Sequence, residues 1–531
     1  MPLSSGRRGP RAFIAEEGQA VAFVALLLTS LFGFVGLVVD VGWFQLNLVR
    51  IQRAADAGAL AGSVYLPGNL PGAQTAALAA TAQNSYTNAV GGVTVTAAQD
   101  SVNTQMLNVS VTAPVRTWFM RLFGVNTITA NRNARAEFIL PVAMGSPQAW
   151  YGVSKLCDDA GTCVVPPSAD GIGSITSGGF WGGVITKGGN HKNGDAYSTY
   201  YNPNPTLNAE YDPNGYSYII DLPTGVSGGT VWIYDPIFCA TGHGASGSYL
   251  GTGDHWIGTG GTGVTTEFKL WDMNGTPYST TDDILIATDL GLFTNMNNVD
   301  KGGSYGGDSR YSDGGYNGGS SADCEASPYH NTWWPLKTGL AAGQYRLQVT
   351  TSSANNNATS AENVFAIQAT WTSGTGGHVY GQSRMCAYVN LPSAGASLFY
   401  LAQVPAVHAG KTLEIKLFDP GDTNNTTLRI KQPTAAGYVD ATFNFTAQGG
   451  TGPSSGTNLT SLITSNGSGN LYDNAWVTID IALPTNYNAP TPPGEPGPGW
   501  WKIEYTVGAP GNDTTTWSVN IRGNPVHLVT P

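Results

Sequence analysis

The stretch that decides the fold runs from Gly18 to Gly62 and reads GQAVAFVALLLTSLFGFVGLVVDVGWFQLNLVRIQRAADAGALAG. Its first part, Val21 to Val39, contains no charged residue. At about 1.5 Å of rise per residue, a helix of this length crosses a hydrocarbon core of roughly 30 Å. We therefore predict a single membrane-spanning helix, with residues 19–41 in contact with the membrane.

The helix is expected to continue beyond the span. Asp40, Gly42 and an interfacial Trp43 follow the apolar run. Small and apolar residues then recur at helical spacing, namely Ile51, Ala54, Ala55, Ala59 and Leu60. The pattern predicts that residues 18–62 form one rod, with the membrane helix passing directly into a stalk helix.

The charges around the span predict its direction. Arg7, Arg8 and Arg11 precede it, and only Arg50 and Arg53 follow closely. Because basic residues favour the cytoplasmic side, residues 1–17 are expected in the cytoplasm and the bulk of the chain outside it. A cleaved secretory signal is the alternative, but the A-x-A patterns at 57–61 lie far beyond the apolar run.

This segment resembles the N-terminal part of TadE/TadG-like proteins of the tight-adherence (Flp) pilus system. The residues that carry the resemblance are Gly18, Asp40, Gly42, Gln52, Ala54, Ala55, Asp56, Ala57, Ala59, Leu60 and Ala61. It covers about the first 140 residues. It implies a membrane-anchored minor component of a pilus or related surface apparatus, with the other subunits as partners.

The resemblance leaves processing and the role of Asp40 open. Cleavage after Gly18 would place Phe23 fifth in the mature chain, where type IV pilins carry glutamate. Asp40 could reach out to water at the membrane boundary, at little cost. The resemblance suggests instead a contact with the helix of a neighbouring subunit.

Composition favours an exported protein without a polyanionic partner. Charged residues make up only 11% of the 531 residues, while glycine is abundant at 70, as in exported β-rich chains. The net charge is −11, with no long run of basic residues. Because nucleic-acid binding requires clustered Lys and Arg, no nucleic-acid partner is expected.

The cysteines are few and all follow the predicted span. Cys157 and Cys163 flank a turn-like DDAGT segment and predict a local disulfide. Cys239 and Cys324 are the second predicted pair. Cys386 then has no partner among the five cysteines, so it is expected either as a buried free thiol or in a different pairing. Zinc is the weaker interpretation, because a structural zinc ion needs four convergent Cys or His ligands.

Residues 63–140 read as a small α+β domain. The segment 73–89 is alanine-rich and helical, and residues 93–96 and 107–111 alternate as strands. A short helix is expected at 117–123 and a last strand at 127–139. The resemblance implies a pilin-like arrangement of this domain, with the long helix on a small sheet.

From residue 150 onward, short alternating runs predict an all-β structure. Two segments repeat: residues 218–236 match residues 399–420, and each ends in an aromatic-Asp-Pro turn. We predict two related β-sandwiches, Ig-like or jelly-roll-like, at residues 200–375 and 390–531. Residues 141–199 would connect them to the first domain and pack on the first sandwich.

The sequence offers little chemistry. The G-x-G-x-x-G match at 258–263 lacks the βαβ context that nucleotide binding needs, and no catalytic residue or cofactor is predicted. Asp419, Asp422 and Asn424 form a weak calcium candidate, since closely spaced oxygen ligands on a turn suit that ion. An ordinary turn explains them equally well.

Tryptophan supplies the one hint of a ligand. The repeated pair Trp333 and Trp476 is expected in the core, but other tryptophans could stack on surface glycans. Two functions therefore stay open. One is a structural or adhesive surface subunit that is not an enzyme, and the other is an exported carbohydrate-binding or glycan-acting protein that uses the same anchor.

Overall fold

The computed structural model describes residues 16–529, apart from interruptions within that range. The interruptions are residues 67–68, 102, 146, 153–155, 158–162, 165–178, 186–193, 198–209, 211, 236–254, 257–265, 276–279, 289–331, 352–360, 392–393, 424, 510 and 524–525. The chain forms two compact units: unit 1 is Met1–Ile139 with Pro525–Pro531, and unit 2 is Leu140–Asn524. Along the sequence, unit 2 is an insertion into unit 1.

Unit 1 is built on one continuous helix, α1 (Glu16–Ser63), which confirms the predicted rod. A second helix, α2 (Leu70–Gln83), lies against its C-terminal part. The Asn69 side chain accepts a hydrogen bond from the Gly72 N–H at 2.8 Å, and Pro71 stands in the first turn, so both helix-start signals are present. The helix predicted at 73–89 is therefore observed at 70–83, so it both begins and ends earlier than predicted.

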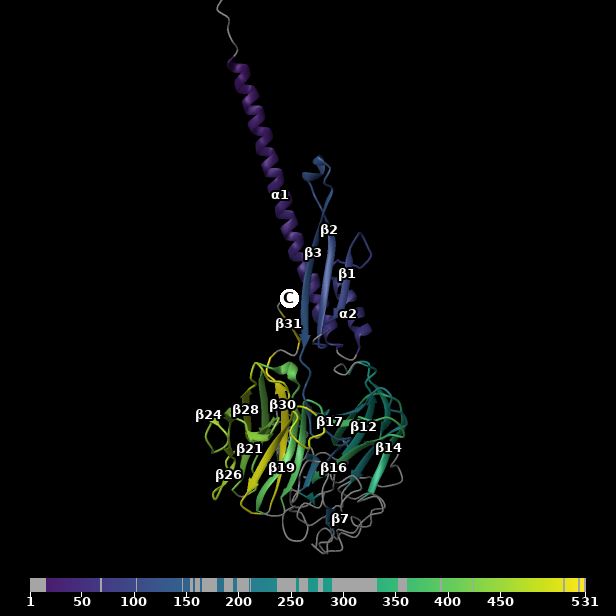
Figure 1. The fold of residues 1–531 in the computed structure, drawn as a ribbon, viewed down its shortest axis with the longest axis vertical. Helices are drawn as coiled ribbons and strands as arrows, with labels where there is room; N and C mark the ends of the chain where they lie inside the picture. Colours follow the sequence, from purple (N-terminus) through teal and green to yellow (C-terminus); the bar gives the residue numbers. More distant parts are fainter. Residues whose placement is uncertain are drawn as a thin grey trace, which may run out of the picture. The chain divides into compact units, whose positions relative to one another are not determined.

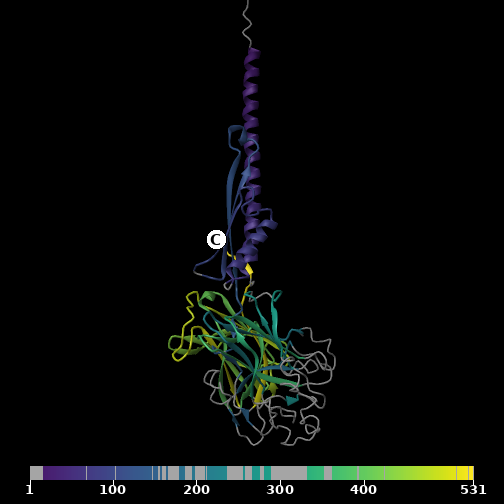
Figure 2. The same cartoon turned by 90° about the vertical axis from the view of Figure 1, so that its right-hand side faces the viewer.

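A four-stranded antiparallel sheet packs on these helices in the order β1-β2-β3-β31. Its strands are β1 (Thr94–Gln99), β2 (Met106–Arg116), β3 (Thr127–Phe138) and β31 (Val526–Val529). The β2–β3 hairpin pairs from Met106↔Glu137 to Arg116↔Thr127 and runs alongside α1 (Figures 1 and 2). At its tip is a 3-10 helix, η1 (Met120–Phe123), ended by Gly124 at φ 87°.

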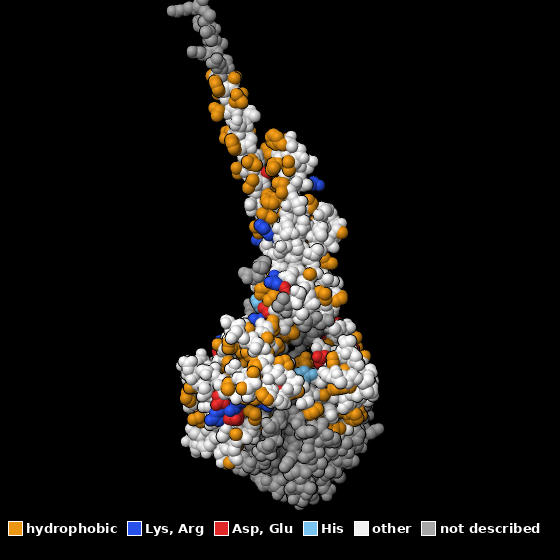
Figure 3. All heavy atoms as spheres, in the orientation of Figure 1, with side chains coloured by type: hydrophobic (Ala, Val, Ile, Leu, Met, Phe, Trp, Pro, Cys, Tyr) orange, Lys and Arg blue, Asp and Glu red, His pale blue; other side chains and the backbone are white. Residues whose placement is uncertain are grey.

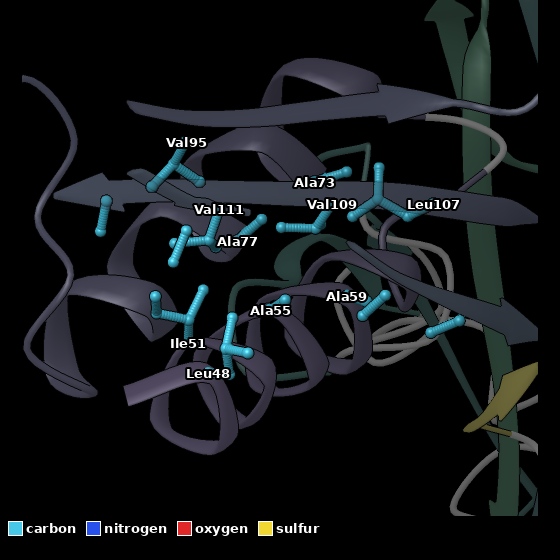
Figure 4. Close-up of a cluster of buried hydrophobic side chains, with 14 of the residues drawn as sticks. Leu48, Ile51, Ala55, Ala59, Ala73, Ala77, Val95, Leu107, Val109 and Val111 are labelled. Carbon is cyan, nitrogen blue, oxygen red and sulfur yellow. The ribbon is translucent and has the colours of Figure 1, made fainter. Parts of the chain in front are cut away.

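The core of unit 1 lies between α1, α2 and the sheet (Figure 4). Strand β2 alternates buried and partly exposed residues, so that Leu107, Val109 and Val111 point inward. Small residues of the helices let the backbones approach. A Cβ on Gly62 would lie 2.3 Å from Leu107 Cδ2 and 2.6 Å from the Ala73 carbonyl oxygen. The alanine-rich sequence after the span is therefore a requirement of close packing.

Unit 2 consists mainly of two large antiparallel sheets. The first has the order β14-β10-β16-β8-β18-β30-β20-β28-β23-β24, with β5 and β11 paired to β16. Its strands are β5 (Trp150–Tyr151), β8 (Gly179–Ile185), β10 (Gly229–Asp235), β11 (His255–Trp256), β14 (Thr332–Leu340), β16 (Ala361–Thr370), β18 (Arg384–Leu391), β20 (Thr412–Phe418), β23 (Phe443–Gln448), β24 (Ser455–Leu459), β28 (Trp476–Ala482) and β30 (Gly511–Ile521).

The second sheet has the order β13-β12-β15-β9-β17-β4-β19-β29-β21-β22, with β25 paired to β21. Its strands are β4 (Ala143–Met144), β9 (Tyr216–Leu222), β12 (Thr266–Asp272), β13 (Ile284–Thr288), β15 (Gly343–Thr351), β17 (His378–Gly381), β19 (Gly395–Gln403), β21 (Thr427–Thr434), β22 (Gly437–Asp440), β25 (Leu462–Ile463) and β29 (Trp500–Val507). Short pieces complete the unit: β6 (Leu156–Cys157), β7 (Cys163–Val164), β26 (Ser465–Asn466), β27 (Gly469–Asn470) and the 3-10 helix η7 (Ala406–His408).

The duplication seen in the sequence reappears in the pairing of the strands. In the first sheet, β8-β16-β10-β14 is mirrored by β18-β30-β20-β28. In the second, β9-β15-β12-β13 is mirrored by β19-β29-β21-β22. Each repeat therefore contributes equivalent strands in the same chain order. The two repeats meet along β8 and β18 in the first sheet and along β17 and β4 in the second.

The strands at the junction are exchanged between the repeats. Strand β4 precedes the first repeat but pairs with β19 of the second, whereas β17 precedes the second and pairs with β9 of the first. Two related sandwiches were predicted at 200–375 and 390–531, and two repeats of strands are present there, but their sheets join edge to edge, so that both sheets continue from one repeat into the other. The reason is edge pairing, because β8 and β4 of the segment 141–199 complete the sheets.

The C-terminal strand also differs from expectation. Residues 526–529 pair with β3, from Phe138↔Val526 to Arg135↔Val529, and so belong to unit 1. His527 Nε2 lies 3.5 Å from the buried Glu137 carboxylate within this pair. A four-residue strand carries no local sign of so distant a partner.

Candidate functional site on the apolar helix and its hairpin

The N-terminal part of α1 presents apolar side chains outward. From Val21 to Val41 the large hydrophobic residues are exposed, and α1 is long and apolar enough to cross a membrane. Figure 3 shows these side chains as an orange stripe along the helix. A soluble core helix would bury them, so the exposure favours a lipid environment.

Two residues interrupt this exposed surface on one side. Gly36 and Asp40, one helical turn apart, are both buried. A Cβ on Gly36 would lie 2.7 Å from the Phe119 ring, so glycine is what allows the hairpin tip to touch the helix here. Asp40 is 3% exposed although it stands in the exposed half of α1.

Asp40 holds the hairpin tip through three charge-assisted hydrogen bonds. The backbone N–H of Trp118 donates to Oδ1 at 2.6 Å, and those of Phe119 and Met120 donate to Oδ2 at 3.0 and 2.6 Å. These donors stand at the start of η1, where helix N–H groups have no partner within the helix. A carboxylate satisfies them well because it accepts several bonds at once.

Aromatic contacts extend the attachment along α1. The Trp43 and Trp118 rings meet edge to face with centroids 6.1 Å apart, and the Arg50 guanidinium lies 5.5 Å from the centre of the Trp43 ring. Beyond this attachment the tip is strongly exposed, with Leu122 at 76% and Phe123 at 84%. The tip is therefore fixed to the helix at one end and apolar at the other.

Most of the residues that carried the pilus resemblance have structural partners inside unit 1. Ala54, Ala55 and Ala59 are fully buried. Gln52 donates one hydrogen bond to Asp56 Oδ1 at 2.8 Å and another to the Asn133 carbonyl oxygen on β3 at 3.1 Å. Gly42 is exposed, and a Cβ there would meet nothing within 4 Å. Ala57, Leu60 and Ala61 are partly exposed on the stalk, and Gly18 lies near the start of α1.

The expected contact of Asp40 with a neighbouring subunit's helix stays a prediction, but its expected role at the water boundary needs correction. The carboxylate does not reach out to water, because it is buried and its own chain supplies three donors. The partners lie 78 to 80 residues away in sequence. No local pattern at Asp40 could have revealed these partners. The hairpin of residues 106–138 is, however, long enough for its tip to contact α1 at Asp40.

The weak calcium candidate is only partly assembled. Asp419 is fully buried at φ 59°, and the Asn470 side-chain amide donates to Asp419 Oδ1 at 3.2 Å and to Asp422 Oδ1 at 3.0 Å. Burial, and then the nearby carboxylates of Asp422, Asp473 and Asp513, raise the pKa of Asp419 well above its usual value. Asn424 lies outside the described residues, and within them no group of three or more His, Cys, Asp or Glu side chains could hold a metal ion.

The predicted disulfides stay predictions, and the structure gives the backbone register of one of the two pairs. Cys157 and Cys163 are register partners across β6 and β7, which agrees with the predicted local pair at the level of the backbone. Cys239 and Cys324 lie outside the described residues. Cys386 is fully buried on β18.

The described tryptophans differ in how far they are buried. Trp500, Trp501 and Trp517 are buried, and Trp500 meets the Tyr400 ring at 5.8 Å. Trp476, expected in the core, is partly exposed and donates from Nε1 to the Glu210 carboxylate at 2.6 and 2.8 Å. Its counterpart Trp333 is also partly exposed. The G-x-G-x-x-G match lies outside the described residues.

Comparison with protein families, with curated proteins and with solved structures gives no match to this chain.

Proposed function

We propose that this chain is a membrane-anchored, extracytoplasmic minor component of a tight-adherence (Flp) type pilus or a related surface apparatus, with a structural or adhesive role. The observation that carries the proposal is α1. Its first half exposes apolar side chains over a length that fits a bilayer, and its second half forms the core of a folded unit. Anchor and first folded unit are thus one element.

This continuity argues for retention of the helix. Ile51, Ala55 and Ala59 are fully buried in the core of unit 1. Cleavage at the A-x-A patterns of 57–61 would remove these residues and leave the inner face of β2 without a partner. Cleavage after Gly18 would leave the core intact, so pilin-like processing is compatible with the fold.

The pilin-like character of unit 1 and the sandwich type of unit 2 are part of the proposal. A long helix that is apolar at its start and lies on a small antiparallel sheet has the outline of a pilin. In unit 2, each repeat has one sheet of strand order β8-β16-β10-β14 and another of order β9-β15-β12-β13. These orders fit a jelly roll, a double-sheet fold built from two Greek keys.

Membrane anchoring is tested by fractionation. The full chain should stay in the membrane pellet after washing with alkaline carbonate, and protease added to intact spheroplasts should digest unit 2. The double variant Leu27→Arg with Phe34→Arg should insert poorly, because each charge costs about 2.5–3.5 kcal/mol at the centre of a membrane helix. Val90→Arg, at an exposed position of unit 1, is the matched control.

The surface role needs a second experiment. Deletion of the chain in its own cell should reduce surface filaments or surface attachment, and the intact chain should restore them. A chain with the double arginine substitution should not restore them. Filaments and attachment that are unchanged without the chain would refute the proposed role, even if the anchoring is real.

The glycan-binding alternative is favoured by one observation, the jelly-roll-like strand order, since that fold also serves lectins. Fold alone does not determine function. Binding of unit 2 to a defined glycan on an array, lost on substitution of a single exposed aromatic residue, would support this second candidate.

A further inference from the structure

We propose that the tip of the β2–β3 hairpin, residues 117–126, is a second membrane contact that inserts into the interfacial layer of the bilayer crossed by α1. The inference rests on the proposed membrane anchor. It adds a contact that the apolar helix by itself does not require.

The Gly36 and Asp40 contacts fix the tip beside the last turn of the apolar run, whose uncharged part ends at Val39. If residues 21–39 cross the hydrocarbon core, the helix leaves that core at Asp40. The exposed side chains of the tip therefore lie at the depth of the lipid headgroups and the outer ends of the acyl chains.

The tip reads TWFMRLFGVN, with an exposed Arg121 and no acidic residue. Its exposed apolar residues are Trp118, Phe119, Leu122, Phe123 and Val125. Tryptophan is enriched at membrane interfaces, where its ring spans the boundary, and arginine binds lipid phosphate through several donors. A basic residue near an anionic headgroup adds an electrostatic attraction to the apolar contact.

Another hairpin of the same chain has a turn of different composition. The β21–β22 hairpin of unit 2 turns through Thr434, Ala435, Ala436 and Gly437, which are small or polar, as a turn in water requires. A tip that exposes Phe123 and Leu122 to water would be an aggregation hazard. The apolar composition of the β2–β3 tip needs a covering, and the neighbouring helix surface already lies in lipid.

Continuity selects the bilayer over a protein partner. Exposed apolar side chains are present on both the tip and α1, drawn in orange in Figure 3, and the carboxylate of Asp40 at the contact between the two segments is buried. A protein that covered the tip would also have to displace lipid from the helix beside it. A bilayer covers both surfaces at once.

The experiment places a photo-crosslinking residue, p-benzoyl-phenylalanine, at single positions of the full chain. The chain is reconstituted at low density in vesicles of phosphatidylcholine and phosphatidylglycerol at about 3:1, irradiated, and examined by mass spectrometry. Position 123 probes the tip, position 27 probes the middle of the span, and position 90 is the control. All three native side chains are at least 60% exposed, so none of the replacements removes core packing.

The expected result is a phospholipid adduct at positions 27 and 123 and none at position 90. An adduct at position 27 without one at position 123 would overturn the inference and leave the membrane anchor standing. An adduct from position 123 to a second protein chain would also overturn it, in favour of a subunit contact. If position 27 gives no lipid adduct, the proposed anchor itself fails.

Discussion

At the scale of single residues, Asp40 decides where the hairpin tip sits. Its two carboxylate oxygens accept hydrogen bonds from the backbone N–H groups of the three consecutive residues 118–120 and so tie them to α1. The side chain is short and buried, so its position is fixed by α1. The tip therefore takes its place from the helix.

Replacing Asp40 by alanine should release the tip while leaving the core of unit 1 folded. Three N–H groups would lose their acceptor, and hydrogen exchange of the amides of residues 118–120 should become roughly tenfold faster or more. Asp40→Asn, which keeps one acceptor oxygen, should fall between the alanine variant and the wild type. Exchange measured by mass spectrometry in detergent micelles checks this, and equal rates in all three proteins would contradict it.

Asp419 should respond to pH in the opposite way to a stabilising carboxylate. The pKa of Asp419 is raised in the folded state, so the folded state binds the proton more tightly than the unfolded chain does. The free energy of unfolding therefore falls as pH rises from the ordinary pKa of an aspartate to the raised pKa of the folded state. At neutral pH the carboxyl group of the unfolded chain is ionised, so burying it on folding costs free energy. Asp419→Asn should therefore raise the melting temperature at pH 7, and the gain should shrink as pH falls towards 4.

The backbone at this position suits the replacement, because asparagine adopts positive φ readily. Thermal unfolding in EDTA at several pH values is the measurement. A wild-type chain that is more stable than the variant at pH 7, with a further gain on adding calcium, would contradict this account and would revive the calcium interpretation.

At the scale of elements, α1 is held in unit 1 by glycines that permit close contact. A Cβ at Gly62 would come within 2.6 Å of both Leu107 and the backbone of Ala73. Gly62→Ala should therefore force α1 away from α2 and β2, at a cost of about 1–3 kcal/mol. The midpoint of urea unfolding of unit 1 in detergent should fall accordingly.

Gly42→Ala is the matched control in the same helix, since a Cβ there meets nothing within 4 Å. It should be neutral or stabilising by about 0.5–1 kcal/mol, because alanine favours a helix over glycine. Equal effects of the two substitutions would show that helix propensity, rather than the contact with β2, governs this position.

The elements of unit 1 could largely be predicted from the sequence, because each leaves a local periodic pattern. The apolar run, the alanine spacing of 51–60 and the alternation of 107–111 all correspond to observed elements. The attachment at Asp40 and the pairing of 526–529 with β3 could not be predicted. Both join segments far apart in the chain, and neither partner changes the local pattern of the other.

At the scale of the whole molecule, the duplicated pattern predicted the strands of unit 2 but not how the copies combine. The matched segments 218–222 and 399–403 are equivalent strands: β9 pairs with β15 in the first repeat, and β19 pairs with the equivalent strand β29 in the second. What the pattern could not reveal is the exchange of β4 and β17, because edge pairing depends on backbone groups rather than on side-chain type.

The exchange predicts that the second repeat does not fold alone. A fragment of residues 378–524 would leave β18 without β8 and β19 without β4, which exposes two strand edges. It should aggregate or stay unfolded, whereas residues 140–524 should unfold in one cooperative calorimetric transition. A soluble 378–524 fragment with its own sharp melting transition would refute this.

The central claim is that α1 is retained as one rod that anchors the chain and forms the core of its first unit. N-terminal sequencing of the full chain, extracted from membranes of the producing cell, tests it most directly. The account predicts a start at Met1 or Pro2, or at Gln19 if the chain is processed like a pilin, with the protein in the membrane fraction. A start beyond Ala61, with the protein free in the medium, would contradict it.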